Sequence, residues 1–142
     1  MKYKNVAYLN YSINDEKMLE EQKNKIIAFA KKQGDEIDKF YIDIGYTRRN
    51  LKRPFYNEMF NDIKNNKVKG CVYIYKLNRI TVILNELLPF LKILNCKKVN
   101  LKSVMDKKEV INDLMNYVEN GNKELTEKIK IAKEMKKRET ER

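Results

Sequence analysis

The feature that most constrains this chain is a regular alternation of strand-type and helix-type segments over its first hundred residues. Runs rich in aliphatic and aromatic residues predict strands at 3–9, 36–43, 69–76 and 99–101. Apolar residues at helical spacing predict helices over about 15–33, 55–63 and 83–94. Pro89 should kink or restart the last of these helices. This order implies an open three-layer α/β sandwich, in which helices cover both faces of a mostly parallel sheet of four to five strands.

The last part of the chain has a different character. No strand pattern remains beyond Ser103. A narrow apolar stripe lies along a predicted helix that is otherwise crowded with charge, at Leu125, Ile129, Ala132 and Met135. A helix of this kind usually needs a partner surface. We therefore expect an α/β domain over 1–105 and a helical extension over 106–142 that includes a long C-terminal helix.

Composition excludes several kinds of site. The chain has 142 residues and no histidine, so imidazole-based triads and histidine metal sites are excluded. The chain has only two cysteines, Cys71 and Cys96, and cannot supply the four thiolates of a zinc site. We expect both cysteines to be reduced thiols in the core. The sequence contains neither of the two glycine-rich motifs that bind nucleotide phosphates, G-x-x-x-x-G-K-S/T and G-x-G-x-x-G, so nucleotide binding is not expected. No apolar run is long enough for a membrane span and no leader pattern is seen, so we expect a cytoplasmic protein with no membrane partner.

The positive charge suggests a polyanion as partner. The formal net charge is +11, but most of the basic residues are lysines. Arginine is more informative, because only six are present and four lie at or beside segment ends: Arg48, Arg49, Arg53 and Arg79. Their planar guanidinium groups suit phosphate oxygens better than lysine does.

Three loops that follow predicted strands carry the groups of chemical interest. Ser12 lies just past the first strand, where a hydroxyl is well placed for attack, although Ser12 and Asp15 also fit a helix-capping box and spacing alone favours the cap. The loop over 43–54 contains a cluster of cations and could equally be a solvated loop. Arg79 follows the third strand and could instead pair with a surface carboxylate.

Together, these loops bring a serine and several arginines to one edge of a parallel sheet. Attack on a phosphodiester needs such a combination, because a serine nucleophile requires the developing phosphorane charge to be balanced. In a chain without histidine, guanidinium groups are the side chains positioned to supply that charge.

Short motifs occur in order along the same part of the chain. They are Tyr8-Leu9-Asn10-Tyr11-Ser12, then Leu19 to Gln22, then Asp43-Ile44-Gly45-Tyr46-Thr47 closed by Arg53-Pro54, and finally Lys76-Leu77-Asn78-Arg79. With these motifs, the chain from about Tyr3 to Ser103 resembles the catalytic domain of the serine recombinases, the resolvase and invertase family.

The resemblance implies a reaction and a set of roles. In this family a serine attacks the scissile phosphate, which gives a 5′-phosphoserine link and a free 3′ hydroxyl, and a tetramer then exchanges and rejoins the strands without a metal or nucleotide cofactor. By position, Ser12 would be the nucleophile, and Arg53 and Arg79 would bind and stabilise the phosphate. Gln22 would support the site. From their places in the same loops and strand ends, we further expect contacts to DNA phosphates from Arg48, Arg49, Lys52 and Lys76, and support of the site from Asn10, Asn78 and Asp43.

The chain departs from the family pattern at the site. Asn10 stands where the family has arginine, Asn78 where it has aspartate, and Val82 where it has a further arginine. Because loss of one transition-state donor costs roughly 3–4 kcal/mol, we expect an impaired recombinase unless Arg48 or Arg49 substitutes for the missing arginines. The alternative is a non-catalytic DNA-binding or interaction module that pairs with an intact recombinase.

The C-terminal helix has a counterpart in the same resemblance. The family has a long helix here that makes the dimer contact and runs onto DNA, and the predicted helix over about 121–142 is similar in its position and its many lysines. The implied partners are therefore DNA and further copies of the chain, as a homodimer or tetramer.

Overall fold

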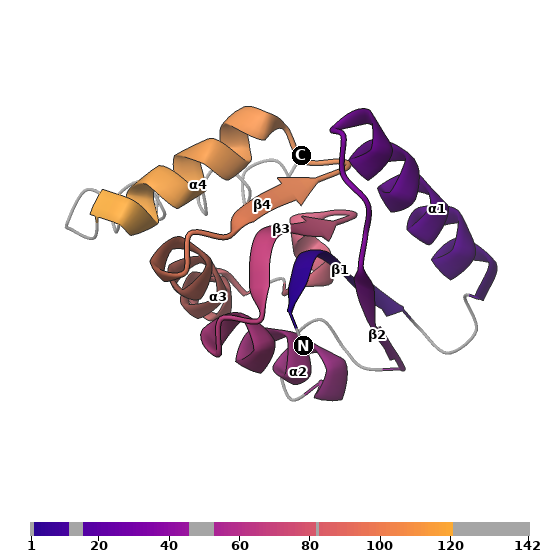
Figure 1. Cartoon of the computed structure of the whole chain (residues 1–142), viewed down its shortest axis with the longest axis horizontal. Helices are drawn as coiled ribbons and strands as arrows, with labels where there is room; N and C mark the ends of the chain where they lie inside the picture. The colour runs from indigo at the N-terminus through magenta and orange to yellow at the C-terminus, as the bar shows by residue number, and fades with distance from the viewer. Residues whose placement is uncertain (1, 12–15, 46–52, 82, 121–142) are drawn as a thin grey trace, which may run out of the picture.

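The computed structural model describes residues 2–11, 16–45, 53–81 and 83–120. In chain order its elements are β1 (Tyr3–Tyr11), α1 (Glu16–Lys32), β2 (Lys39–Ile44), α2 (Pro54–Lys64), β3 (Val68–Ile74), the 3-10 helix η1 (Leu77–Arg79), α3 (Leu84–Cys96), β4 (Asn100–Ser103) and α4 (Lys108–Asn120) (Figure 1). Strands and helices alternate along the chain, as the sequence pattern predicts.

The strands form one sheet in the order β2-β1-β3-β4, and all neighbouring strands are parallel. β1 lies between β2 and β3, and its residues from Asn5 to Tyr11 are all buried. A strand that is covered on both faces needs a mostly apolar sequence instead of an alternating one, which is the pattern seen in β1. The predicted α/β sandwich is confirmed, with a sheet of four strands.

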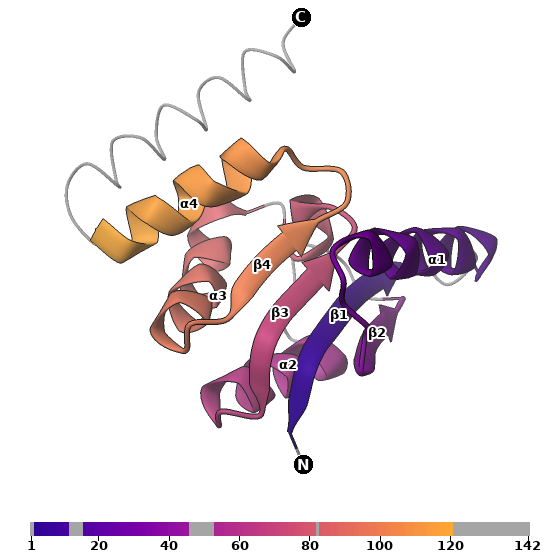
Figure 2. The same cartoon turned by 45° about the horizontal axis from the view of Figure 1, so that its top comes forward.

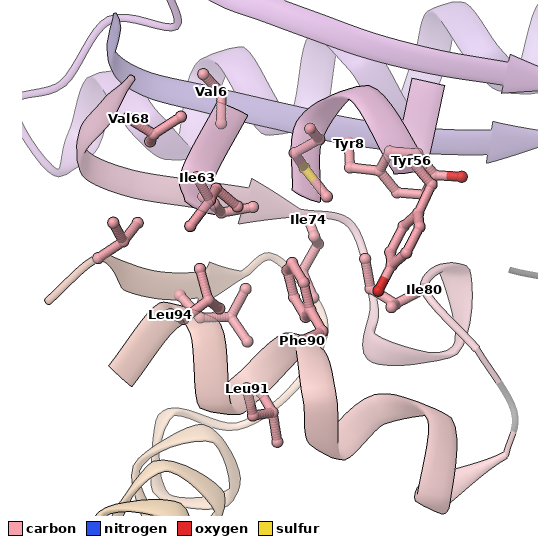
Figure 3. Close-up of a cluster of buried hydrophobic side chains, with 14 of the residues drawn as sticks. Val6, Tyr8, Tyr56, Ile63, Val68, Ile74, Ile80, Phe90, Leu91 and Leu94 are labelled. Carbon is pink, nitrogen blue, oxygen red and sulfur yellow. The ribbon is translucent and has the colours of Figure 1, made fainter. Parts of the chain in front are cut away.

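Helices cover both faces of the sheet (Figure 2). One face, with Ala7 and Leu9 of β1, packs against Ile26 and Ala30 of α1. The other face packs against α2, α3 and α4 in a larger cluster (Figure 3). Its buried members include Val6, Tyr8, Tyr56, Ile63, Ile74, Phe90 and Leu91. The predicted three-layer arrangement is therefore confirmed.

The last described helix, α4, packs against α3 and β4 and buries Ile111 and Val118 in the larger cluster. The predicted apolar stripe over 125–135 lies outside the described residues, and the division of the chain at residue 105 stays a prediction. None of the helices in the described ranges is both long enough and apolar enough to cross a membrane.

Three local predictions differ from the structure. β2 begins at Lys39 instead of residue 36, and Asp38 just before it uses its carboxylate to accept the backbone N–H groups of Lys4 (2.8 Å) and Asn5 (3.2 Å). α3 continues as one helix through Pro89, so the predicted restart is wrong, and a kink at Pro89 stays a prediction. Both cysteines are free, but Cys96 is exposed at the end of α3, so the prediction of a core thiol is wrong for that residue.

Candidate functional site

The candidate site lies where β1, β2 and β3 end at one edge of the sheet. Asn10 and Asp43 are register neighbours on β1 and β2. The other predicted site residues that the structure describes are Arg53 at the start of α2, Gln22 on the second turn of α1, and Lys76, Asn78 and Arg79 after β3. Ser12, Arg48, Arg49 and Lys52 lie outside the described residues, as does Val82.

Asp43 is fully buried and accepts hydrogen bonds from three donors. The Tyr8 hydroxyl donates to Oδ2 at 2.8 Å, and the backbone N–H groups of Phe55 and Tyr56 donate at 3.0 and 2.9 Å. The side chain at the N-cap position of α2 does not cap the helix. Asp43, on β2, instead accepts hydrogen bonds from the free backbone N–H groups of the first turn of α2. Burial raises the pKa of Tyr8, and the hydrogen bond to Asp43 adds to this rise, while the charge of Arg53 opposes it. The Tyr8 hydroxyl therefore keeps its proton and remains a donor.

Arg53 is also fully buried. Its Nη1 donates to the carbonyl oxygen of Arg79 at 3.0 Å, and its Nη2 donates to that of Ile80. Its guanidinium carbon lies 5.3 Å from the ring centroid of Tyr8 and 4.9 Å from that of Tyr56, which favours a cation between two aromatic faces. Arg53 thus ties the start of α2 to the turn that follows β3.

Arg79 is the last residue of η1 and is partly exposed. Its guanidinium carbon lies 5.2 Å from the ring centroid of Tyr11, the last residue of β1. Burial raises the pKa of Tyr11, and the charge of Arg79 opposes that rise. Lys76, just before η1, is exposed. The contact between Arg79 and Tyr11 brings the end of β1 together with the turn after β3.

Buried polar atoms without a hydrogen-bond partner gather in this set of residues. Among the described side chains, they are Asn10 Oδ1, Tyr11 Oη, Gln22 Oε1, Arg53 Nε, Asn78 Oδ1 and Arg79 Nε. Every one belongs either to a predicted site residue or to Tyr11. Because buried polar atoms are nearly always paired in native proteins, this concentration indicates a place that water or a polar ligand completes. Of the two described guanidinium groups, that of Arg79 is partly exposed, and a guanidinium beside neutral amides can bind an anion.

Sequence reasoning missed Tyr8 and Tyr11 as parts of this site. Both belong to the motif from Tyr8 to Ser12, but an aromatic residue on a buried strand is normally interpreted as a residue of the hydrophobic core. The hydroxyl of Tyr8, which donates to Asp43, and the ring of Tyr11, which lies against the Arg79 guanidinium, connect them to the site. In the described ranges, no group of three or more His, Cys, Asp or Glu side chains is placed to hold a metal ion.

Comparisons with known proteins agree with this architecture. The catalytic domain of TP901-1 integrase superposes with a TM-score of 0.63 and 25% identity, over 71% of this chain and 76% of that one. A resolvase family site-specific recombinase from Streptococcus pneumoniae gives a TM-score of 0.61 and 28% identity, over 96% and 99% of the two chains. The catalytic domain of ISC1926 TnpA, an IS607-like serine recombinase, has a similar fold, with a TM-score of 0.64 and 18% identity over 93% and 97%.

The sequence itself also matches a known family. None of the curated protein sequences matches this chain. The family model for the resolvase N-terminal domain, however, matches residues 5–141, which is nearly the whole chain. The chain therefore belongs to the resolvase N-terminal domain family and has the fold of a serine recombinase catalytic domain.

Proposed function

We propose that this domain cleaves and rejoins DNA through a 5′-phosphoserine intermediate, at a rate below that of a recombinase with the full family set of residues. The Ser12 hydroxyl gives up its proton as its oxygen forms a bond to the scissile phosphorus. The bond from phosphorus to the 3′ oxygen breaks, and that oxygen takes up a proton to become a free hydroxyl, so no net proton is gained or lost. Rejoining is the reverse attack by a 3′ hydroxyl, so the chemistry needs no external energy source.

The observation that carries this proposal is the group of unpartnered polar atoms at the carboxyl ends of β1 and β3. Arg79 is partly exposed and its Nε has no partner among the described residues, and phosphate oxygens are acceptors of matching charge for its guanidinium. Ser12 comes directly after Tyr11, whose ring lies under the Arg79 guanidinium. A phosphate held by Arg79 would therefore lie close to the end of the strand that leads to Ser12.

The reduced rate follows from the three positions at which the chain lacks the charged residues of the family pattern. Asn10 and Asn78 offer neutral amides, and Val82 offers no polar group. Each missing transition-state donor costs roughly 3–4 kcal/mol, which is a factor of 10² to 10³ in rate. The cations of the loop between β2 and α2, at Arg48, Arg49 and Lys52, are proposed as contacts to neighbouring DNA phosphates, together with Lys76.

The test is covalent capture on DNA. Supercoiled plasmid carrying the DNA that flanks the gene is incubated with the protein, quenched with detergent and examined for protein on a 5′ end. We expect an adduct with the wild type and none with Ser12→Ala. A third protein combines Asn10→Arg, Asn78→Asp and Val82→Arg and should form the adduct faster. An adduct that survives Ser12→Ala, or one formed only by the restored protein, would show that the natural chain does not use this chemistry.

The hydrogen bonds that Arg53 already makes within the protein favour a second function. Both of its Nη groups already donate to backbone carbonyls, so of the two arginines that the structure describes at the site only Arg79 is partly exposed. Among the described residues, a site with one exposed guanidinium group suits a module that binds DNA or an intact recombinase without cleaving. In that case Ser12→Ala changes neither DNA binding nor the activity of the partner. In either function we propose assembly as a homodimer or tetramer through the segment over 106–142.

A further inference from the structure

The turn that presents Asn78 and Arg79 is too short to hold its own shape. η1 has three residues, and the hydrogen bonds that close it run from Arg79 N to Lys76 O (2.9 Å) and from Ile80 N to Leu77 O (3.0 Å). Its N-cap residue, Lys76, is extended and makes no side-chain cap. Short 3-10 turns have weak hydrogen-bond geometry, so the orientation of Arg79 depends on contacts from outside the turn.

One such contact comes from the loop after β4. The backbone N–H of Leu77 donates to Asp106 Oδ2 at 2.6 Å, which supplies from a distant segment the cap that Lys76 lacks. The same carboxylate oxygen accepts a hydrogen bond from the Ser103 hydroxyl at 2.7 Å. The backbone N–H of Asp106 in turn donates to Ser103 Oγ at 3.1 Å. Ser103 is buried and its hydroxyl also lies 3.3 Å from the carbonyl oxygen of Tyr75, so the pair holds the Asp106 carboxylate beside the segment that follows β3.

The loop that carries Asp106 is itself joined to the end of β3. Val104 N donates to Ile74 O at 3.0 Å, and Met105 N donates to Tyr75 O at 2.9 Å. The loop thus continues the pairing of β4 with β3 beyond the last residue of each strand. Asp106 therefore sits on backbone that is anchored to the segment leading into η1.

The far end of η1 is held by Arg53, which donates to the carbonyl oxygens of Arg79 and Ile80. The turn is thus fixed by Asp106 at its first residue and by Arg53 at its last. We propose that Asp106, oriented by Ser103, is a positioning residue that keeps the Arg79 guanidinium over Tyr11 and ready to bind a phosphate. This inference rests on the proposed function, because it assigns Arg79 to the phosphate.

The test compares three variants in the full chain. Asp106→Ala removes the acceptor, and Asp106→Asn keeps an amide oxygen in its place. Asp38→Ala is the matched control, since the Asp38 carboxylate likewise accepts two hydrogen bonds, but from the backbone N–H groups of Lys4 and Asn5 at the opposite end of β1. The first measurement is amide hydrogen exchange by NMR at Leu77, Arg79 and Ile80. The second is the shift of the Arg79 Nε–H signal on titration with a short DNA duplex.

We expect Asp106→Ala to speed exchange at the three amides by about tenfold or more and to raise the DNA concentration needed for the Arg79 shift by a similar factor. Asp106→Asn should restore most of both, and Asp38→Ala should change neither. Unchanged exchange in Asp106→Ala overturns the inference, as does faster exchange with an unchanged Arg79 response, which is the pattern of a purely structural role. Failure of the proposed phosphate site is separately visible, because the wild-type Arg79 signal would then not respond to DNA at all.

Discussion

Two arginines that look alike in the sequence have different surroundings in the fold. Arg53 is fully buried between Tyr8 and Tyr56, whereas Arg79 is partly exposed over Tyr11. A loop arginine before a proline predicts the start of a helix but does not predict burial. Arg53 folds inward because its acceptors are carbonyl oxygens of residues 26 and 27 positions later in the chain, which local sequence patterns do not contain.

This difference predicts unequal losses of stability. Arg53→Met removes a charged donor from two carbonyl oxygens and a cation from two aromatic rings, so the free energy of unfolding should fall by about 3 kcal/mol. Arg79→Met makes the same chemical change at a partly exposed position and should cost about 1 kcal/mol or less. Urea denaturation followed by circular dichroism measures both values. Similar losses for the two variants would contradict the structural role assigned to Arg53.

At the scale of elements, α3 shows two sequence signals in conflict. Proline inside a helix removes one backbone hydrogen bond and its ring crowds the preceding turn, which is why a kink or restart is predicted at Pro89. The same segment has apolar residues at helical spacing, and Leu87, Phe90, Leu91 and Leu94 are all buried. Both Pro89 and Asn85, whose carbonyl loses its helical partner, are exposed, so water can satisfy that carbonyl. Burial of the apolar face therefore keeps one continuous helix.

Although α3 is continuous, the proline lowers its stability because one backbone hydrogen bond is missing. Pro89→Ala should restore the hydrogen bond to the Asn85 carbonyl and raise the free energy of unfolding by about 1–3 kcal/mol. Lys92→Ala, at an exposed position of the same helix, should change it by less than about 0.5 kcal/mol. Chemical denaturation of the two variants beside the wild type makes the comparison. A loss of stability in Pro89→Ala would mean that the ring itself contributes packing to α3.

Elements with many apolar residues were the most predictable. The observed ranges of β1, β3 and α1 are close to the predicted ones, because a buried strand or an amphipathic helix produces a pattern of apolar residues over many positions. The turn η1 was not predicted, since three residues carry no periodicity. The hydrogen bond from Leu77 to Asp106 that caps the turn is not predictable from local sequence either. The two residues are 29 positions apart and are brought together by the parallel pairing of β3 and β4.

At the scale of the whole molecule, the alternation of elements and the ordered motifs are enough to predict the fold, and they place the candidate site at the edge of the sheet where β1, β2 and β3 end. They do not predict how charge is distributed around that edge. The formal net charge of +11 is a property of the whole chain, and any cation could contribute to DNA binding. The location of phosphate contacts is therefore a question for paired variants that remove the same charge from different places.

Binding of a labelled DNA duplex should fall by roughly 10²- to 10³-fold between 50 and 200 mM salt and should be indifferent to sequence, as expected for about five phosphate contacts, at Arg79, Arg48, Arg49, Lys52 and Lys76. Arg79→Gln removes one cation from the site, and Lys31→Gln removes one from the exposed end of α1, away from the sheet edge where β1 ends. Because each lost phosphate contact lowers the slope of log affinity against log salt by about 1, Arg79→Gln should flatten the slope by that amount and Lys31→Gln should leave it near the wild-type value. Fluorescence anisotropy gives both slopes. Equal slopes for the two variants would place the phosphate contacts elsewhere on the molecule and remove Arg79 from the proposed DNA site.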